Sequence, residues 1–536
     1  MEEYTLDGRL LTLLAQPLRI EEIRRALPDI GKHELKDALD RLTQDGKIMK
    51  NKKNRFAVAS HYGCATGTFL ATERGFAFVA PDVEPGEPKP DDYFIPPNAG
   101  GGAWHGDRVL VKISERKNNR GRHEATVLRV LSRSGKELTG ELVQRGKAFF
   151  VQPSSKKYPE IAVSRRDIGD AQVGDCVAVE VTSYGDDTYH PQGVVSAALG
   201  ENGTMEASIA AILHENGVFD VFPDEVLKQA DAIPQQVDLA SAGKRLDLRD
   251  KLIFTIDGDD AKDFDDAVSL EKLDNGHYLL GVHIADVSHY VEEDGWLDKE
   301  ALKRGTSVYL LNRVVPMLPK GLSNGICSLN EGEDRLTLSC FMEIDAQGEV
   351  VHHELAESVI NSKARMVYDD VSELLEHETP ALRAKYAPLL ADIRAMGELA
   401  RVLRDKRKQR GSLDFDFAES EIVLDACEHP IVIRPAERRS ANRLIEEFML
   451  IANETVAEHF YWMNYPFVYR VHEKPDTEKM MDLKAFLMNF GIHLKGNPDN
   501  IYPKTLADII DTIADEPYEA VVNRVILRTM KKAYYS

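Results

Sequence analysis

The first 60 residues alternate apolar and polar positions with the spacing of short helices. Apolar stripes at helical spacing cover residues 10–18, 20–27 and 33–45. Two short runs of strand-forming residues around a basic turn follow between Gly46 and Val58. Three helices followed by a hairpin predict a winged helix over residues 1–60, a fold that occurs in proteins that bind DNA, RNA or other proteins.

A repeated pattern of short alternating strands follows. Each copy begins with a glycine, continues through an Arg-Gly segment rich in aromatic residues, and ends in a strand that starts with Gly-Asp. These features lie at Gly67, 74–79 and 106–111, and again at Gly140, 145–151 and 174–179. Strands of this length, separated by glycine and proline, are typical of a five-stranded OB-type barrel. We therefore predict two barrels, over residues 61–133 and 136–200.

The strand over residues 74–79 carries two alternating phenylalanines. It resembles the nucleic-acid-binding strand of cold-shock domains, in which exposed aromatic rings stack on bases while basic side chains contact phosphates. In that arrangement Phe76 and Phe78 contact bases, and Arg74 contacts phosphate. Alternatively, the two phenylalanines fill the core of the barrel. The sequence leaves both alternatives open.

Residues 201–536 combine strands and helices without a second linker signal, so we assign them to a connecting segment followed by one mixed α/β domain. Within this region, residues 441–459 form an amphipathic pattern whose apolar stripe includes Leu444 and Phe448. Glu446 lies on the polar face of this expected helix. The whole chain is therefore predicted to be a multidomain α+β protein.

Charge is distributed unevenly along the chain. The 536 residues carry a net charge of −22, yet residues 101–170 have 15 basic against 8 acidic side chains, and residues 251–300 have 4 against 14. A basic region beside an acidic one fits a nucleic-acid grip joined to a metal site, and two ordinary solvated faces are the alternative.

Composition also indicates the cellular compartment. No apolar run approaches the roughly 20 residues needed to span a bilayer, and the acidic N-terminus lacks a signal-peptide pattern. The five cysteines are scattered and form no Cys-x-x-Cys pair, which argues against a disulfide framework and against a zinc site. We expect a cytoplasmic protein with no membrane partner.

Six aspartates occur within the ten residues from Asp257 to Asp266, and apolar residues typical of strands flank them on both sides. Carboxylates this close repel one another unless a cation offsets their charge or some become protonated. A calcium-binding EF-hand loop starting at Asp257 needs glycine at its sixth position and glutamate at its twelfth, where this chain has Lys262 and Val268. The pattern instead predicts a carboxylate cage for Mg²⁺ or Mn²⁺, with a solvated acidic turn as the alternative.

The sequence of residues 255–268, Thr-Ile-Asp-Gly-Asp-Asp-Ala-Lys-Asp-Phe-Asp-Asp-Ala-Val, resembles the signature of the ribonuclease II/ribonuclease R family. Residues 283–290, 304–309, 315–319 and 322–329 resemble further motifs of that family. A winged helix followed by two cold-shock domains is similar to the ribonuclease R arrangement in particular. The resemblance implies a ribonuclease II-type catalytic domain that hydrolyses RNA from its 3′ end to nucleoside 5′-monophosphates with metal-activated water, in RNA turnover. It implies single-stranded RNA and RNA 3′ ends as partners of a monomeric enzyme.

The resemblance also implies roles for individual residues. Four aspartates match the catalytic and metal-binding set of the family: Asp257, Asp263, Asp265 and Asp266. Asp265 matches a residue whose loss is expected to abolish cleavage while sparing RNA binding, and Asp266 is expected to bind metal directly. Three more residues match substrate contacts: Tyr309 for the 3′-terminal nucleotide, Glu446 for the RNA end, and Phe415 for base stacking, with Phe417 as its competitor. The alternative for Tyr309 is a buried tyrosine in a strand, and the alternative for Glu446 is an exposed glutamate in a salt bridge.

Relatives in this family continue with a His-Phe-Thr-Ser-Pro-Ile-Arg-Arg-Tyr segment and a further OB-type domain, neither of which follows Ser536 here. The resemblance therefore implies a catalytic domain that is incomplete at its C-terminus, and we expect weak or absent activity from the 536-residue chain alone. The alternative function is that of a catalytically impaired RNA-binding regulator that retains the ribonuclease fold.

Overall fold

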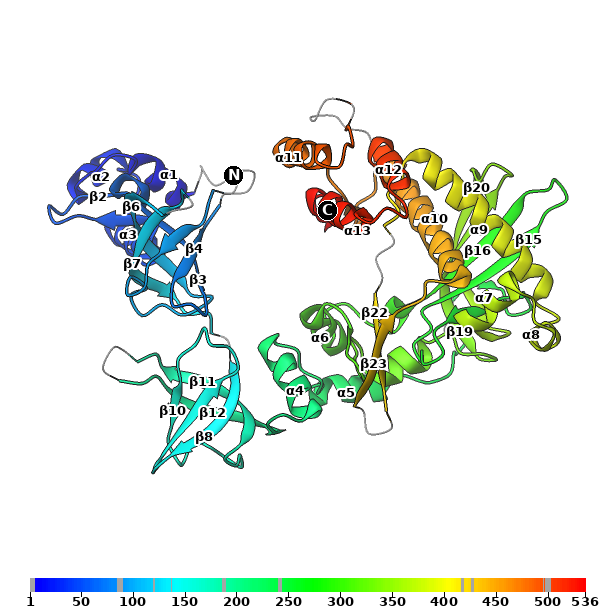
Figure 1. Ribbon diagram of the computed structural model, residues 1–536, viewed down its shortest axis with the longest axis horizontal. Coiled ribbons are helices and arrows are strands. Elements are labelled where there is room, and N and C mark those ends of the chain that lie inside the picture. The colour runs from blue at the N-terminus through cyan, green and yellow to red at the C-terminus, as the bar shows by residue number, and fades with distance from the viewer. Residues whose placement is uncertain are drawn as a thin grey trace. The chain divides into compact units, whose positions relative to one another are not determined.

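The computed structural model describes residues 5–83, 90–118, 121–135, 137–185, 189–239, 243–415, 419–425, 429–494, 496 and 503–536. The chain forms two compact units, Met1–Phe219 and Asp220–Ser536 (Figure 1). Each unit has hydrophobic cores of its own. Among the described residues, no helix is long and apolar enough to cross a membrane.

Three helices and a two-stranded antiparallel hairpin form the start of the first unit. Helix α3 buries Leu35, Ala38, Leu39 and Leu42 because these residues share one helical face. The helices and the hairpin lie within a few residues of the bounds that the sequence predicts. Their bounds are α1 (Leu6–Leu13), α2 (Ile20–Ala26), α3 (Lys32–Gln44), β1 (Ile48–Lys50) and β2 (Phe56–Val58), followed by a 3₁₀ turn, η2 (Ala59–Tyr62).

Two closed five-stranded barrels follow, which confirms the two OB-type barrels in the predicted fold class. The first has the strand order β3-β4-β5-β7-β6 and the second β10-β12-β11-β8-β9. The first barrel consists of β3 (Cys64–Ala71), β4 (Ala77–Pro81), β5 (Tyr93–Ile95), β6 (Arg108–Lys117) and β7 (His123–Ser132). The second consists of β8 (Leu138–Arg145), β9 (Ala148–Pro153), β10 (Ile161–Val163), β11 (Asp175–Ser183) and β12 (Gln192–Glu201).

The two copies of the repeat begin with glycine for the same structural reason, which is that a side chain does not fit at this position. A Cβ on Gly67 would overlap the carbonyl oxygen of Ala80, and a Cβ on Gly140 would overlap that of Gln152. Both glycines lie on the first strand of a barrel, where the neighbouring strand approaches closely. Only glycine permits that approach without displacing the backbone.

A helix after the second barrel belongs to the first unit. Helix α4 (Met205–Glu215) packs Ala207 and Ala211 against Cys176 of the barrel. Thr139 on β8 donates a hydrogen bond to Glu215 over 2.5 Å. Helix α4 buries its apolar face against the barrel, so this part of the connecting segment belongs to the first unit.

A five-stranded sheet forms the centre of the second unit, in the order β13-β20-β19-β16-β15, and α7, α9 and α10 pack against one face (Figure 1). Buried residues such as Val282, Met342 and Phe448 form the core between sheet and helices. The sheet strands are β13 (Leu246–Asp247), β15 (Asp266–Lys272), β16 (Tyr278–Ala285), β19 (Asp334–Ile344) and β20 (Val350–Asn361). The helices are α7 (Tyr368–Glu376), α8 (Pro380–Lys385), α9 (Leu390–Arg410) and α10 (Ser440–Trp462).

Helix α10 confirms the amphipathic helix that was expected over residues 441–459, and it extends slightly beyond those bounds at each end. A separate apolar cluster joins α11 (Thr477–Met488), α12 (Pro503–Thr512) and α13 (Glu519–Thr529). The other helical elements are α5 (Asp224–Asp231), η3 (Val287–His289), α6 (Trp296–Arg304) and η4 (Gly321–Ile326). The remaining strands form short pairs: β14 (Thr255–Asp257) with β21 (Arg365–Val367), β17 (Val308–Tyr309) with β18 (Val314–Val315), β22 (Ser420–Leu424) with β23 (Pro430–Pro435), and β24 (Arg470–Val471) with β25 (Tyr534–Tyr535).

Candidate functional site

The acidic segment is a turn between two strands, as the sequence predicts. Asp257 is the last residue of β14, and Asp266 is the first residue of β15. Phe254 and Val268, which flank the turn, form an antiparallel bridge and are fully buried. The carboxylates are therefore carried by a turn whose two ends are anchored in the protein interior.

Hydrogen bonds from a distant segment hold the backbone of this turn. The Ser328 hydroxyl accepts a hydrogen bond from the Phe264 amide at 3.0 Å, and the Leu329 amide donates to the Phe264 carbonyl at 2.9 Å. Arg335 in turn donates from Nε to the Ser328 carbonyl at 2.8 Å. Buried backbone groups require such partners, so the segment around Ser328 determines the conformation of the acidic turn.

Arg365 on β21 anchors the same turn from another side. Strand β21 pairs in parallel with β14, and Arg365 Nη2 donates to the carbonyl of Asp259 at 2.5 Å. Its guanidinium also lies over the ring of Phe264, 5.2 Å from the centroid. Arg365 thus places a positive charge beside the carboxylates, although its hydrogen bond goes to the backbone.

The carboxylates of the turn make one another harder to ionise. Burial, followed by the charges of Asp266, Asp265 and Asp263, raises the pKa of Asp257 to about 7, and the charge of Arg365 only partly opposes this. Burial and the charge of Asp265 raise the pKa of Asp266 to about 6. Burial and the charge of Asp263 also raise the pKa of Asp265. Such mutual repulsion is relieved by protonation or by a bound cation.

A divalent cation fits these residues chemically. Asp257 Oδ2 is buried and has no hydrogen-bond partner among the described residues. However, no group of three or more His, Cys, Asp or Glu side chains in the described part of the chain is already arranged to hold a metal ion. Carboxylates can close around an ion by side-chain rotation, and a bound cation would offset the charges that Asp263, Asp265 and Asp266 place beside Asp257.

Exposure differs among the six aspartates. Asp257, Asp263 and Asp266 are partly buried, whereas Asp259, Asp260 and Asp265 are exposed. Exposure alone therefore does not divide the four aspartates selected by family resemblance from the other two.

Tyr309 lies beside the acidic turn. Its hydroxyl donates a hydrogen bond to Asp263 Oδ2 over 3.0 Å, while the side chain as a whole is 68% exposed. Burial of the hydroxyl, together with this hydrogen bond and the charges of Asp263 and Asp265, raises the pKa of Tyr309. The alternative of a buried strand tyrosine is wrong, because β17 forms only a short hairpin with β18 and leaves the ring in solvent.

The other expected substrate contacts of this unit lie on different elements. Glu446 is on α10 and forms an ion pair with Arg438, which agrees with the salt-bridge alternative. Phe415 is partly buried and packs against the cluster of α11, α12 and α13. Phe417, its competitor, lies outside the described residues.

The phenylalanines of the first barrel point away from its core. On β4, Ala77 and Val79 are buried inside, whereas Phe76 just before the strand and Phe78 are only partly buried, so the core alternative is wrong. Phe94 joins them, with its centroid 5.6 Å from that of Phe76. Arg74 is exposed on the adjoining turn, and Arg122 lies over the ring of Phe78 at 5.2 Å.

Several residues near the candidate sites could not be found from the sequence. Arg365 and Ser328 hold the acidic turn, and Tyr368, whose pKa is raised to about 12 by burial and by the charges of Asp257 and Asp266, lies beside the carboxylates. Phe94 and Arg122 extend the aromatic surface of the first barrel. Only Ser328 belongs to a segment with a recognisable motif, at 322–329. The others lie in strands, in a helix or, for Arg122, in the loop before β7, and no sequence pattern marks them as site residues.

Comparison with known proteins agrees with this arrangement. The family model of the RNB domain matches residues 245–536, that of the ribonuclease B OB domain matches 67–130, and that of the cold shock domain matches 150–223. Over 529 residues the chain is 41% identical to ribonuclease R of Thermotoga maritima. This alignment covers 97% of this chain and 73% of the Thermotoga protein. The chain belongs to the ribonuclease R family.

Other ribonuclease R proteins and solved structures extend the comparison. Ribonuclease R of Mycoplasma genitalium, solved in complex with ribose-methylated single-stranded RNA, has a TM-score of 0.80 at 26% identity, covering 88% of this chain and 73% of that chain. Yeast Ssd1, described as a pseudonuclease, has a TM-score of 0.64 at 19% identity, covering 94% of this chain and 65% of that chain, and shows the likeness of fold alone. The chain spans 61–75% of the lengths of its bacterial ribonuclease R relatives.

Proposed function

We propose that this protein is a hydrolytic exoribonuclease that shortens RNA from its 3′ end and releases nucleoside 5′-monophosphates. Membership of the ribonuclease R family supports this function. The observation that carries it is the turn between β14 and β15, where burial and the charges of neighbouring carboxylates together raise the pKa of Asp257 and of Asp266. Charge repulsion of this kind suits a site that binds a cation and a phosphodiester together.

The proposed cofactor is Mg²⁺, with Mn²⁺ as a substitute, held by Asp257, Asp263, Asp265 and Asp266. When bound, the ion supplies Lewis-acid activation of water and neutralises charge on the phosphodiester. Asp257 Oδ2, which is buried and has no hydrogen-bond partner among the described residues, is free to bind the ion. Ser328 and Arg365 keep the turn in place, so the carboxylates do not move apart under their own repulsion.

Three residues of the second unit are proposed to position the RNA end. The exposed ring of Tyr309, tied through its hydroxyl to Asp263, can orient the last nucleotide directly beside the carboxylates. Phe415 offers a face for base stacking, and Glu446 can accept a hydrogen bond from a ribose hydroxyl. Positioning of this kind lowers the barrier because the reacting groups are held in a productive geometry.

The first unit is proposed to capture single-stranded RNA. Phe76 and Phe78 form a partly exposed aromatic surface with Phe94, on which bases can stack. Arg74, exposed on the same barrel, can contact phosphate. We also propose that the protein acts as a monomer, as the family resemblance implies. We propose a cytoplasmic location, since the four cysteines of the described part are free and buried, as is usual in a reducing compartment.

A catalytically impaired RNA-binding regulator is the second candidate. It is favoured by the finding that the described residues include no group of three or more acidic, His or Cys side chains already arranged around a metal position. Titration calorimetry with Mg²⁺ separates the two candidates, with Asp265→Asn as the control. Divalent binding that weakens in the variant supports the enzyme, and the absence of such binding supports the regulator.

An RNA-cleavage assay tests the proposed activity directly. Shortening of a single-stranded RNA labelled at its 5′ end, even if weak, should be stepwise, depend on Mg²⁺ and release nucleoside 5′-monophosphates, while a circular RNA of the same sequence should stay intact. Asp265→Asn should bind the linear RNA without shortening it. Cleavage of the circle, or equal shortening by Asp265→Asn, would contradict the proposed function.

A further inference from the structure

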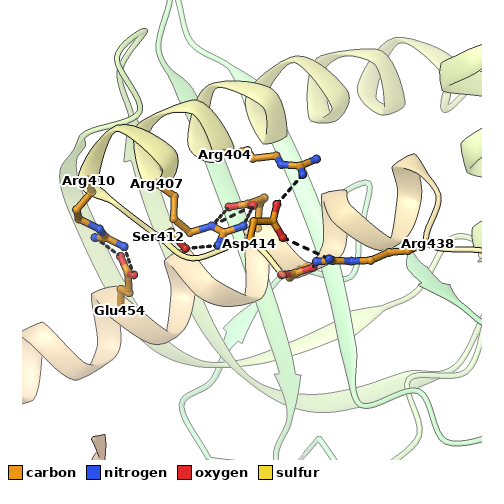
Figure 2. Close-up of polar contacts among 9 residues, drawn as sticks. Arg404, Arg407, Arg410, Ser412, Asp414, Arg438 and Glu454 are labelled. Atoms are coloured by element: carbon orange, nitrogen blue, oxygen red, sulfur yellow. Dashed lines mark hydrogen bonds and ion pairs between the residues drawn. The ribbon is translucent and has the colours of Figure 1, made fainter. Parts of the chain in front are cut away.

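A network of charged residues joins α9 to α10 at the end where α9 stops (Figure 2). Arg407 on α9 pairs with Glu447 on α10 over 2.6 Å, and both side chains are largely buried. Arg407 Nη1 also donates to the Ser412 hydroxyl at 2.7 Å. The residues immediately after α9 are thus tied to both helices through one guanidinium.

Asp414 lies at the centre of the next part of the network (Figure 2). Arg404 Nη2 donates to Asp414 Oδ2 at 2.7 Å, and Arg438 Nη1 lies 3.5 Å from Asp414 Oδ1. Burial raises the pKa of Asp414, but the hydrogen bond from Arg404 and the charges of Arg404, Arg438 and Arg407 outweigh it and hold the pKa below its usual value. Asp414 therefore remains charged and bound from two sides.

Arg438 connects this carboxylate to a second one. It lies in the segment between β23 and α10, and its Nη2 pairs with Glu446 Oε2 on α10. A guanidinium is planar and presents several donors in a fixed fork, so one Arg438 side chain can hold two carboxylates in a defined relative position. Asp414 directly precedes Phe415, and Glu446 lies at the other end of the bridge.

We propose that Arg438 is a positioning residue that sets Phe415 and Glu446 relative to each other, and through them the 3′-terminal nucleotide of the substrate. This inference rests on the proposed function, in which Phe415 and Glu446 contact the RNA end. Arg438 acts through its two carboxylate partners rather than by touching RNA. Loss of the bridge should therefore misplace the RNA end while leaving overall RNA affinity almost unchanged, because most of the affinity of such proteins comes from contacts along the strand.

The chain offers a matched control in the same network. Arg410 on α9 pairs with Glu454 on α10 over 2.5 Å, but both residues are about half exposed, and this pair involves neither Asp414 nor Glu446 (Figure 2). Exposed ion pairs contribute little to stability. Arg410→Gln therefore removes an α9–α10 salt bridge without breaking the bridge between Asp414 and Glu446.

A kinetic experiment tests the proposal. Under single-turnover conditions, Arg438→Gln should slow release of the terminal nucleotide by about 10- to 100-fold, as expected for a misplaced reacting group, while the dissociation constant for RNA changes by less than about threefold. Arg410→Gln should keep the wild-type rate. Glu446→Gln should slow release less when added to Arg438→Gln than when added to the wild-type protein, because Arg438→Gln has already displaced Glu446 from the RNA end. Asp414→Asn breaks the same bridge at its other carboxylate, and it replaces Arg438→Gln in these measurements if Arg438→Gln does not fold.

A binding experiment separates this inference from the proposed activity. Asp265→Asn is mixed with single-stranded RNA carrying 2-aminopurine at its 3′ end, whose fluorescence falls when the base stacks on an aromatic ring. The double variant Asp265→Asn/Arg438→Gln should lose most of this fall in fluorescence, whereas the double variant Asp265→Asn/Arg410→Gln should retain it. If the wild-type protein did not cleave RNA, the proposed function would be overturned. The fluorescence response would still test whether the bridge between Asp414 and Glu446 positions the terminal base.

Three results would overturn the role of Arg438. One is equal behaviour of Arg438→Gln and Arg410→Gln in rate and fluorescence. Another is a loss of RNA affinity in Arg438→Gln as large as its loss of rate, which would indicate a direct RNA contact. The third is the absence of any fluorescence change with Asp265→Asn, because the terminal base then does not stack where Phe415 and Glu446 lie.

Discussion

Aspartates in this protein experience opposite environments according to their neighbours. Asp414 lies between arginines, which hold its pKa below the usual value, whereas Asp257 lies among other carboxylates, and burial and their charges raise its pKa to about 7. Both side chains are partly buried. The sign of the neighbouring charge therefore decides whether a buried carboxylate stabilises the fold or strains it.

Asp257→Asn should stabilise the metal-free protein. The folded protein favours the protonated form of Asp257, so the favourable contribution is complete below pH 3.8 and is lost as the pH rises through about 7. Asparagine keeps the shape of the side chain without the charge and should add at least about 1 kcal/mol of stability near pH 8. Urea denaturation in the presence of a chelator measures this gain.

The same substitution should reduce stabilisation by Mg²⁺. Any ion that binds only the folded state raises the melting temperature, and the loss of one carboxylate ligand weakens that binding. The shift in melting temperature on adding Mg²⁺ should therefore be smaller for Asp257→Asn than for the wild type. A metal-free variant that is less stable than the wild type, with an undiminished shift, would contradict the electrostatic account.

His283 forms a buried polar chain on the sheet face opposite α9 and α10. Its Nε2 lies 3.0 Å from the Ser269 hydroxyl and its Nδ1 lies 2.7 Å from the Ser339 hydroxyl, which in turn contacts the Ser358 hydroxyl at 2.6 Å. Burial, followed by the charge of Lys251, lowers the pKa of His283 from 6.5 to about 3. The ring therefore remains neutral in the folded protein.

The neutral His283 should make folding stability depend on pH. Because its folded pKa is depressed, its contribution is complete above pH 6.5 and is lost as the pH falls toward about 3. The loss should reach about 1.4 kcal/mol per pH unit, which corresponds to one proton. His283→Asn should be less stable at neutral pH and lose less stability on acidification, as measured by denaturation at several pH values. His352→Asn, at an exposed position on β20, should keep the wild-type slope.

At the level of single elements, alternate residues of strand β4 face the barrel core and an aromatic surface outside it. Ala77 and Val79 fill the barrel, while Phe78 lies on the other side with Phe76 and Phe94. This partly exposed cluster of three aromatic rings leaves some apolar surface in water unless a ligand covers it. Base stacking is a use that suits this geometry.

Phe78→Ala should weaken binding of single-stranded RNA by about 1 to 3 kcal/mol, the range for loss of one stacked base. Leu128, on β7 of the same barrel, is 49% exposed and gives a matched apolar control. Fluorescence anisotropy with a labelled RNA should show weaker binding for Phe78→Ala and wild-type binding for Leu128→Ala. Equal affinities of the two variants would exclude stacking on β4.

At the level of the whole molecule, the chain divides at Phe219 and Asp220 into two units with separate cores. Separate cores predict separate unfolding events. Scanning calorimetry should therefore show more than one transition, and Asp257→Asn should shift only a transition that belongs to residues 220–536. A single cooperative transition, shifted as a whole by Asp257→Asn, would show that the units unfold together.

Local pattern determined much of this protein. The spacing of leucines predicts α3, the amphipathic stripe predicts α10, and apolar residues on both sides of the aspartates predict the turn between β14 and β15. The repeat predicts two barrels, down to the glycines at 67 and 140. These features depend on neighbours in the sequence, so periodicity and turn residues suffice to reveal them.

Only the tertiary structure decided which residues complete the sites. Arg365 and Ser328 contact the acidic turn from roughly 60 to 110 positions along the chain. Local periodicity does not predict contacts between residues so far apart in the sequence. The bridge made by Arg438 joins the end of α9 to α10 in the same way. Phe78 could face inward or outward until the register of β4 was known, because shifting a strand by one residue exchanges its two faces. The sequence thus determined the carboxylates themselves, and folding determined the partners that hold them, because those partners come together only when distant segments pack.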